Sequence, residues 1–150
     1  MDTRISHIAK LIVRFKEYRM HKGSYLCGAV EYEVNGPLGQ IIYCHCSRCR
    51  KANGSAFVAV APVAAADFRM TKGDAVLHSY RSDAGVHRMF CGNCGSPIIG
   101  RRENAPETVR LRIGTLDTPV EGKVSAHIFV GSKAVWDDIH DGAPQFEERP

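Results

Sequence analysis

From residue 23 onward, the chain consists of short apolar runs separated by glycine and proline. Residues 29–34 and 109–113 alternate apolar and polar positions, as half-buried strands do. Further short strands are expected at residues 41–43, 56–61, 76–80, 86–90, 97–100 and 126–130. Many short strands without long helical periodicity predict a mostly β fold of small antiparallel sheets in a single domain.

The same pattern makes several local predictions. Pro62 is expected to end the strand at 56–61, and residues 64–68 are expected to form a short helical turn or loop. Trp136 to Ile139 could form one helical turn. In the alternating run at 109–113, Arg110 and Arg112 are expected on the solvent-exposed face.

The length of 150 residues with 44% hydrophobic content supports one sizeable core. We expect a basic N-terminal extension at residues 1–22 and one folded domain at residues 23–150. No run approaches the ~18 apolar residues of a membrane span, and the N-terminus has no secretory signal pattern. A cytoplasmic protein without membrane association is therefore expected.

The net charge of +4 resides in the extension, which holds six basic and two acidic residues. The remaining 14 basic and 14 acidic residues cancel, so we expect no nucleic-acid partner. Ile5, Ile8, Ile12 and Phe15 have near-helical spacing, so the extension could be a basic amphipathic helix that anchors to a surface. A weakly docked or unstructured extension is the alternative, and we favour it.

Six cysteines dominate the candidate chemistry. Cys44, Cys46 and Cys49 lie within six residues, and Cys91 and Cys94 form a second cluster around Gly92. In a reducing compartment, such closely spaced thiols indicate metal binding more than disulfides. Zinc is the expected ion, and Cys27 either joins one of these sites or is free.

The central cluster supplies three thiols, whereas zinc favours four ligands. An open fourth position would accept an external thiol, lower its pKa and leave a thiolate able to add to an aldehyde. The alternative is a closed structural site with His45 as fourth ligand, although strand geometry would point His45 to the opposite face. The neighbouring Arg48, Arg50 and Lys51 could bind the carboxylates of a glutathione-like tripeptide, lower thiol pKa values, or simply be solvated.

Several motifs in order resemble one known family. The first is Gly23-Ser24-x-Leu26-Cys27-Gly28, and the second is the Cys-His-Cys-x-x-Cys-Arg-Lys cluster at 44–51 with Gly54-Ser55-Ala56-Phe57. The others are the segment 91–96, which contains Cys91 and Cys94, and the segment from His127 to Phe146. The chain resembles the glutathione-dependent formaldehyde-activating enzyme family, which also includes centromere protein V. The resemblance implies small antiparallel sheets around a zinc-ribbon-like core.

The resemblance also implies two zinc sites, so one or two ions are expected per chain. Cys27, Cys91 and Cys94 fall on a structural site, and Cys44, Cys46 and Cys49 fall on a reactive one. One departure concerns the structural site, because Tyr25 stands where the family usually has a further cysteine. A phenol is a poor ligand beside thiolates, so that site could be completed by water or by a histidine such as His21, be weakly loaded, or be replaced by packing.

Two functions follow from these residues and the resemblance. The first is a zinc-dependent carbon-sulfur lyase that adds glutathione or another thiol to formaldehyde or a small aldehyde. Its partners would be a small-molecule thiol and a small aldehyde, with Cys44, Cys46 and Cys49 as the catalytic residues. The alternative is a non-catalytic zinc-binding interaction module of the same family.

Overall fold

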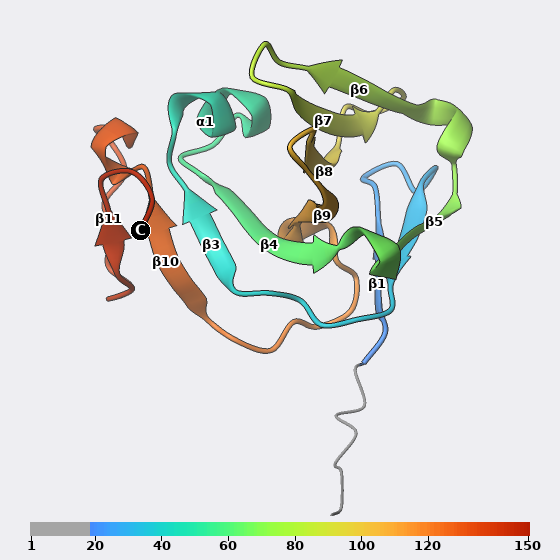
Figure 1. Ribbon diagram of the computed structural model, residues 1–150, viewed down its shortest axis with the longest axis horizontal. Coiled ribbons are helices and arrows are strands. Elements are labelled where there is room, and N and C mark those ends of the chain that lie inside the picture. Colours follow the sequence, from blue (N-terminus) through green and yellow to red (C-terminus); the bar gives the residue numbers. More distant parts are fainter. Residues whose placement is uncertain (1–18) are drawn as a thin grey trace, which may run out of the picture.

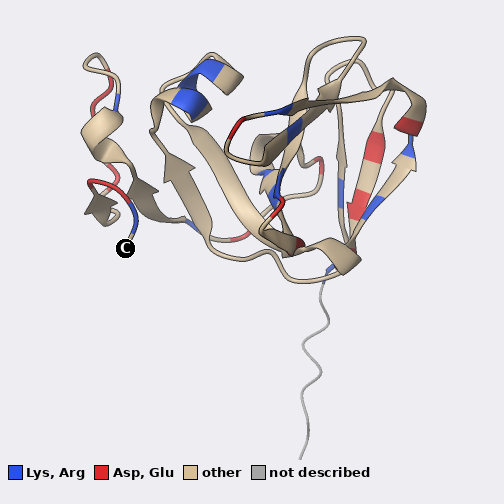
Figure 2. Cartoon of the chain, turned by 45° about the horizontal axis from the view of Figure 1, so that its top comes forward, with Lys and Arg blue, Asp and Glu red and all other residues tan. Residues whose placement is uncertain are grey.

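The computed structural model describes residues 19–150, which form two β-sheets and one short α-helix (Figure 1). The smaller sheet has the strand order β1-β2-β5, with antiparallel pairing throughout. Its strands are β1 (His21–Ser24), β2 (Glu31–Val34) and β5 (Phe68–Lys72). The smaller sheet carries several residues of each charge (Figure 2), including the pairs of Glu33 with Arg69 and of Glu31 with Lys72.

The larger sheet has eight strands in the order β11-β10-β3-β4-β9-β8-β7-β6. Their bounds are β3 (Ile41–Cys44), β4 (Val58–Ala64), β6 (Leu77–Arg81), β7 (Val86–Cys91), β8 (Pro97–Arg102), β9 (Ala105–Arg112), β10 (Val124–Ile128) and β11 (Gln145–Phe146). The predicted mostly β fold is confirmed. Within it, β10 pairs in parallel with both β3 and β11, because the long connection after β9 brings β10 back along the same direction as β3.

The helical segments are short. The α-helix α1 (Ser47–Asn53) follows β3, and the 3₁₀ turns are η1 (Ala65–Asp67), η2 (Asp74–Val76), η3 (Ile113–Thr115) and η4 (Val130–Ser132). The turn η1 falls where residues 64–68 predicted one. The expected helical turn at 136–139 is wrong, because this segment is held by a single turn bond from Asp137 N to Ala134 O and is not followed by further helical residues.

The main core lies between the two sheets. The smaller sheet contributes Tyr32 and Val34, and β9 contributes Val109 and Leu111, all nearly inaccessible to solvent. Because strand residues alternate in direction, burial of Val109 and Leu111 turns Arg110 and Arg112 to the opposite face of the larger sheet. That opposite face forms the site described below.

Pro62 does not end its strand as expected. Strand β4 continues to Ala64, and Pro62 pairs with Arg110 of β9. Strand β3 pairs with β4 only as far as Val60, so a backbone donor is not required of Pro62 on that side. Its carbonyl instead accepts the Gly39 amide at 2.8 Å.

The predicted amphipathic extension lies largely outside the described residues. Strand β1 begins at His21, two residues before the expected domain boundary, and Lys22 bonds through its backbone to Asp117 N and Thr118 Oγ1. Among residues 19–150, no helix has the length and apolar character needed to cross a membrane.

Removal of residues 1–19 is expected to leave the melting temperature within about 2 °C of the full chain, because β1 stays complete. Removal of residues 1–24 should lower it by about 5 °C or more, since β1 covers the edge of β2, where Tyr32 and Val34 are buried. Thermal unfolding followed by circular dichroism would measure both. Equal melting temperatures for the two deletions would show that β1 is not part of the stable domain.

Candidate metal centre

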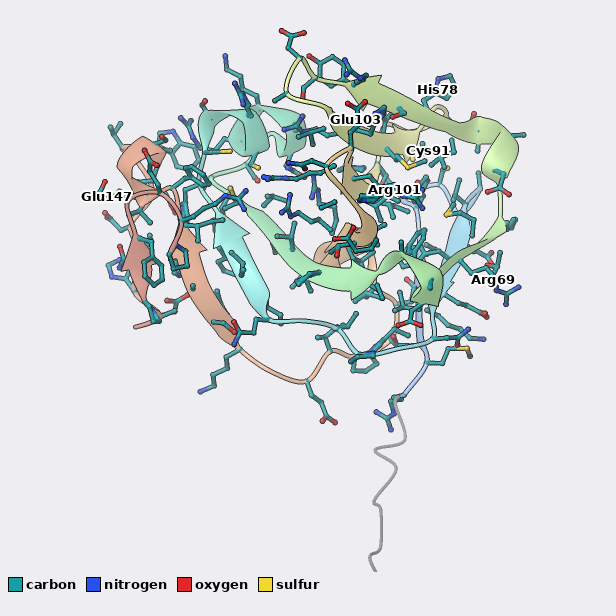
Figure 3. The ribbon with its side chains drawn as sticks, viewed as in Figure 1. Arg69, His78, Cys91, Arg101, Glu103 and Glu147 are labelled. Carbon is teal, nitrogen blue, oxygen red and sulfur yellow. The ribbon has the colours of Figure 1, made fainter. Side chains whose placement is uncertain are left out.

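The structure gathers the six cysteines into two groups of three. One group contains Cys44, Cys46 and Cys49, and the other contains Cys27, Cys91 and Cys94. Within each group, all three Sγ atoms lie within 4.8 Å of one another. In Figure 3, sulfur atoms gather below α1 and beside the labelled Cys91. Three thiols at this separation fit a tetrahedral zinc ion with Zn–S distances near ~2.3 Å.

The central group is assembled by the junction of β3 and α1. Cys44 is the last residue of β3, Cys46 is the N-cap of α1, and Cys49 lies in its first turn. Cys46 Sγ accepts a hydrogen bond from the Cys49 amide at 3.4 Å. A thiolate is well suited to this position, because the first amides of a helix lack internal acceptors. Hydrogen bonds from the Cys44 thiol, the Cys49 thiol and the helix amides lower the pKa of Cys46.

His45 points away from this thiol group, as its place on an extended segment predicted. Its side chain is 0% exposed, and its Nε2 lies 2.8 Å from Nδ1 of His127. His127 Nε2 in turn lies 2.9 Å from Asp141 Oδ2. Neutral histidines fit this chain when His127 donates to Asp141 and His45 donates to His127. Burial, followed by the neighbouring His127, lowers the pKa of His45 and favours its neutral form. His45 therefore fixes the backbone between Cys44 and Cys46 through its contact with His127 of β10, which is itself held by Asp141.

The central thiols lie in the wall of a cavity of about 490 Å³. The wall is formed mainly by the face of the larger sheet that is turned away from the main core, together with α1, residues after β10 and the C-terminal tail. Apolar side chains, including Val58, Val60 and Ile128, line part of it. Gly100 has no side chain, which leaves space next to Arg112. A Cβ on Gly100 would lie 3.8 Å from the guanidinium nitrogens of Arg112.

Arginine is the dominant charged residue of this cavity. Among the residues that the structure describes, six arginines line it, namely Arg48, Arg88, Arg102, Arg110, Arg112 and Arg149, and no aspartate or glutamate does. In Figure 3, nitrogen-bearing side chains gather in the space between α1, β4 and β8. Of the three basic residues singled out beside the cysteines, only Arg48 lines the cavity, whereas Arg50 and Lys51 do not.

Arg110 and Arg112 share a face, as their alternation predicted, but that face encloses the cavity and does not lie open to solvent. Arg112 is only 8% exposed. The expectation of a solvent-exposed face was wrong, because strand alternation does not reveal that other elements cover this side of the sheet. The remaining cavity arginines, Arg88, Arg102 and Arg149, were not identified from the sequence.

The second thiol group lies beside the main core. Cys91 ends β7 and is 0% exposed, and its Sγ lies 3.7 Å from Sγ of the exposed Cys27. The Ser96 amide, and to a lesser extent hydrogen bonding with Cys27, lowers the pKa of Cys94 to about 7. Three converging thiols, one of them readily ionised, fit a metal ion.

Tyr25 packs next to this group but does not supply a fourth thiolate. Its side chain is 3% exposed, and its Oη is buried without a hydrogen-bond partner among residues 19–150. Burial, followed by proximity to Cys91, raises the pKa of Tyr25, so the phenol is held in its neutral form. His21 lies in β1 near Thr118 and does not join the thiol group.

Substituting Tyr25→Cys is expected to strengthen zinc retention and raise the melting temperature by about 3 °C or more, because a soft fourth ligand replaces a buried, unpartnered hydroxyl. The measurement is zinc content after dialysis against increasing chelator, paired with thermal unfolding. Tyr25→Phe is the control, since it removes the hydroxyl without adding a ligand. Identical zinc retention in the Cys variant and the parent would show that this site is already four-coordinate or binds no metal.

The chain is similar to known proteins in both sequence and fold. The family model for glutathione-dependent formaldehyde-activating enzymes matches residues 20–132. A Phaeosphaeria nodorum protein that carries the name of such an enzyme is 28% identical over 117 residues, which cover 78% of this chain and 53% of that protein. The chain thus spans about half the length of this curated relative. The crystal structure of a Rhodobacter sphaeroides protein is 28% identical with a TM-score of 0.57, and the match covers 69% of this chain and 96% of that one. Because the family match extends over most of the chain, the protein belongs to the glutathione-dependent formaldehyde-activating enzyme family.

Proposed function

We propose that this protein is a zinc-dependent carbon-sulfur lyase that catalyses the reversible addition of a thiol, such as glutathione, to formaldehyde or another small aldehyde. The observation that carries the proposal is the placement of Cys44, Cys46 and Cys49 in the wall of an arginine-lined cavity. The family name and the name of the fungal relative support the same substrates. A purely structural zinc site would not need a cavity of about 490 Å³ next to its ligands.

Each part of the cavity has a role in this reaction. Zinc held by the three cysteines would supply a fourth coordination position at which an incoming thiol loses its proton more readily. Arginine side chains would bind the carboxylates of a glutathione-like thiol and fix its orientation. In the addition, a carbon–sulfur bond forms, the carbonyl π electrons move to oxygen, and the thiol proton is finally transferred to that oxygen.

The second thiol group, Cys27, Cys91 and Cys94, would serve stability. It lies against the main core and is absent from the cavity wall. We therefore assign it a structural zinc, which gives up to two ions per chain. A cytoplasmic, reducing location would keep all six thiols available for these roles.

The test is exchange spectroscopy by NMR between formaldehyde and its glutathione adduct, at several concentrations of the zinc-loaded protein. The exchange rate should rise in proportion to protein concentration. Metal content is measured on the same samples. An exchange rate that does not change with protein would contradict this activity and favour a non-catalytic zinc-binding module.

A further inference from the structure

The arginines of the cavity come from distant parts of the chain. Arg48 lies in α1, Arg88 in β7, Arg102 in β8, and Arg110 and Arg112 in β9. Strand pairing places them in rows, because Arg88 is opposite Gly100, and Gly100 is opposite Arg110. Arg149 approaches from the C-terminal tail, where its guanidinium lies 5.4 Å from the ring centroid of Phe129. Such convergence of guanidinium groups on one cavity indicates an anionic ligand.

Within residues 19–150, these guanidinium groups lack partners of opposite charge. Among residues 19–150, no ion pair involves any of the six. The Nε atoms of Arg102 and Arg112 are buried and have no hydrogen-bond partner in the described part of the chain, and Arg112 is more than nine-tenths buried. Buried charges are normally paired, since desolvation of an unpaired charge is costly. The absent partner is expected to arrive with the ligand.

The arginines also repel one another. Burial and then the neighbouring Arg149 lower the pKa of Arg102, and burial and then Arg102 lower that of Arg110. Three thiolates around a divalent zinc would carry a single net negative charge, which offsets only a small part of six guanidinium charges. Glutathione adds two carboxylates but also an ammonium group. Each carboxylate can be satisfied by one bidentate guanidinium, so glutathione leaves several of these groups unpaired.

We propose that this cavity selects a thiol that carries at least three anionic groups, supplied by phosphates or carboxylates, over glutathione. The proposal rests on the proposed function in taking the ligand to be a thiol. The thiol end would lie at Cys44, Cys46 and Cys49, with the apolar side chains Val58 and Ile128 beside its linking arm. The anionic groups would lie among Arg88, Arg102, Arg110 and Arg149, where both phosphate and carboxylate can make paired hydrogen bonds to guanidinium.

Isothermal titration calorimetry on the full-length, zinc-loaded protein tests this selection with two matched pairs of thiols. Coenzyme A is compared with pantetheine, which has the same thiol arm but lacks the phosphates and the nucleoside, and the salt dependence of binding separates the charge of the phosphates from contacts of the nucleoside. The peptide γ-Glu-Cys-Glu is compared with glutathione, which has one carboxylate fewer. The more anionic member of at least one pair should bind about tenfold more tightly than its partner and than glutathione, and this advantage should shrink at high salt. An advantage for coenzyme A identifies phosphate as the source of charge, and an advantage for γ-Glu-Cys-Glu identifies carboxylate.

Variants separate the cavity charge from surface charge. Arg110→Gln should reduce the advantage of the preferred thiol about tenfold. Arg88→Gln is a second cavity variant in case the first fails to fold. Arg101→Gln is the control, because Arg101 is exposed and does not line the cavity, and it should leave the advantage unchanged. Equal or tighter binding of glutathione than of both polyanionic thiols would overturn the proposal, as would an equal effect of Arg101→Gln and both cavity variants.

The same samples distinguish this inference from the proposed function. Formaldehyde exchange is followed by NMR with each of the four thiols. Protein-dependent exchange that is fastest with glutathione, without preference for the anionic thiols in binding, would overturn the inference and leave the lyase activity standing. Preferential binding of a polyanionic thiol without accelerated exchange for any thiol would overturn the lyase activity and support the selection for charge.

Discussion

Replacing Cys46 with serine is expected to reduce protein-dependent exchange between formaldehyde and its thiol adduct at least 100-fold, close to the uncatalysed rate. Cys46 Sγ contacts both the Cys49 amide and the other two thiols of the central group, so its loss removes one ligand and disturbs the position of the others. A serine hydroxyl is a much weaker ligand for zinc than a thiolate. The measurement is NMR exchange spectroscopy at matched protein concentrations, with zinc content determined in parallel.

The same variant should remain folded, because the central group lies at the end of β3 and the helix that follows it has no buried residue. We expect its melting temperature to fall by less than that of a variant in the second thiol group. Ser125→Ala is a suitable control, since Ser125 lies in β10 and does not line the cavity. Full activity in Cys46→Ser would exclude the central thiols as the site of the reaction.

Replacing Cys91 with serine is expected to lower the melting temperature by about 10 °C or more and to release the zinc of the second group. Cys91 is fully buried in the main core, in the same cluster as Ile98 and Leu111. Serine would place a hydroxyl in this apolar environment and remove a ligand at the same time. Structural zinc is worth about 10 to 16 kcal/mol of apparent binding free energy in small peptides, so its loss should be felt by the whole fold. Thermal unfolding and metal analysis measure the two effects.

Cys27→Ser is the matched comparison for Cys91→Ser. Cys27 belongs to the same thiol group but is exposed, so its replacement removes a proposed ligand without placing a hydroxyl in the core. Its melting temperature should fall by less than that of Cys91→Ser. If both variants have the same melting temperature as the parent protein, the second group does not hold a metal that stabilises the fold.

Features that depend on neighbouring residues in the chain could be predicted from the sequence. Strands β2, β3, β6 and β7 appear where short apolar runs predicted them, and β6 and β7, which are neighbours in the sequence, pair with each other. The grouping of the thiols followed from their close spacing, because two cysteines separated by two residues can face one centre from a single turn. The joining of Cys27 to Cys91 and Cys94 came only from the family resemblance, since 64 residues separate Cys27 from Cys91.

Features that depend on pairing between distant strands could not be predicted. The parallel pairing of β10 with β3 places residues near position 128 beside the central thiols, and nothing in either strand alone specifies that pairing. The arginine lining has the same origin, because Arg88, Arg102 and Arg110 come from three strands whose register brings them together. Each one viewed alone has the pattern of an ordinary exposed strand residue. Only the folded structure shows that these arginines line the same cavity.

Helix α1 has an unusual dependence on the residues that cap it. None of its residues is buried, so it gains little from hydrophobic packing, and with seven residues it is too short to be stable by itself. Its beginning is fixed by Cys46, and its end by Gly54 in a left-handed conformation. We therefore expect α1 to be persistent only while β3 holds Cys44 in place and the three thiols are kept together. Arg48 reaches the cavity from this helix, so we expect local unfolding of α1 to displace Arg48, Cys46 and Cys49 from the cavity wall, while Cys44 stays in β3 and both sheets remain intact.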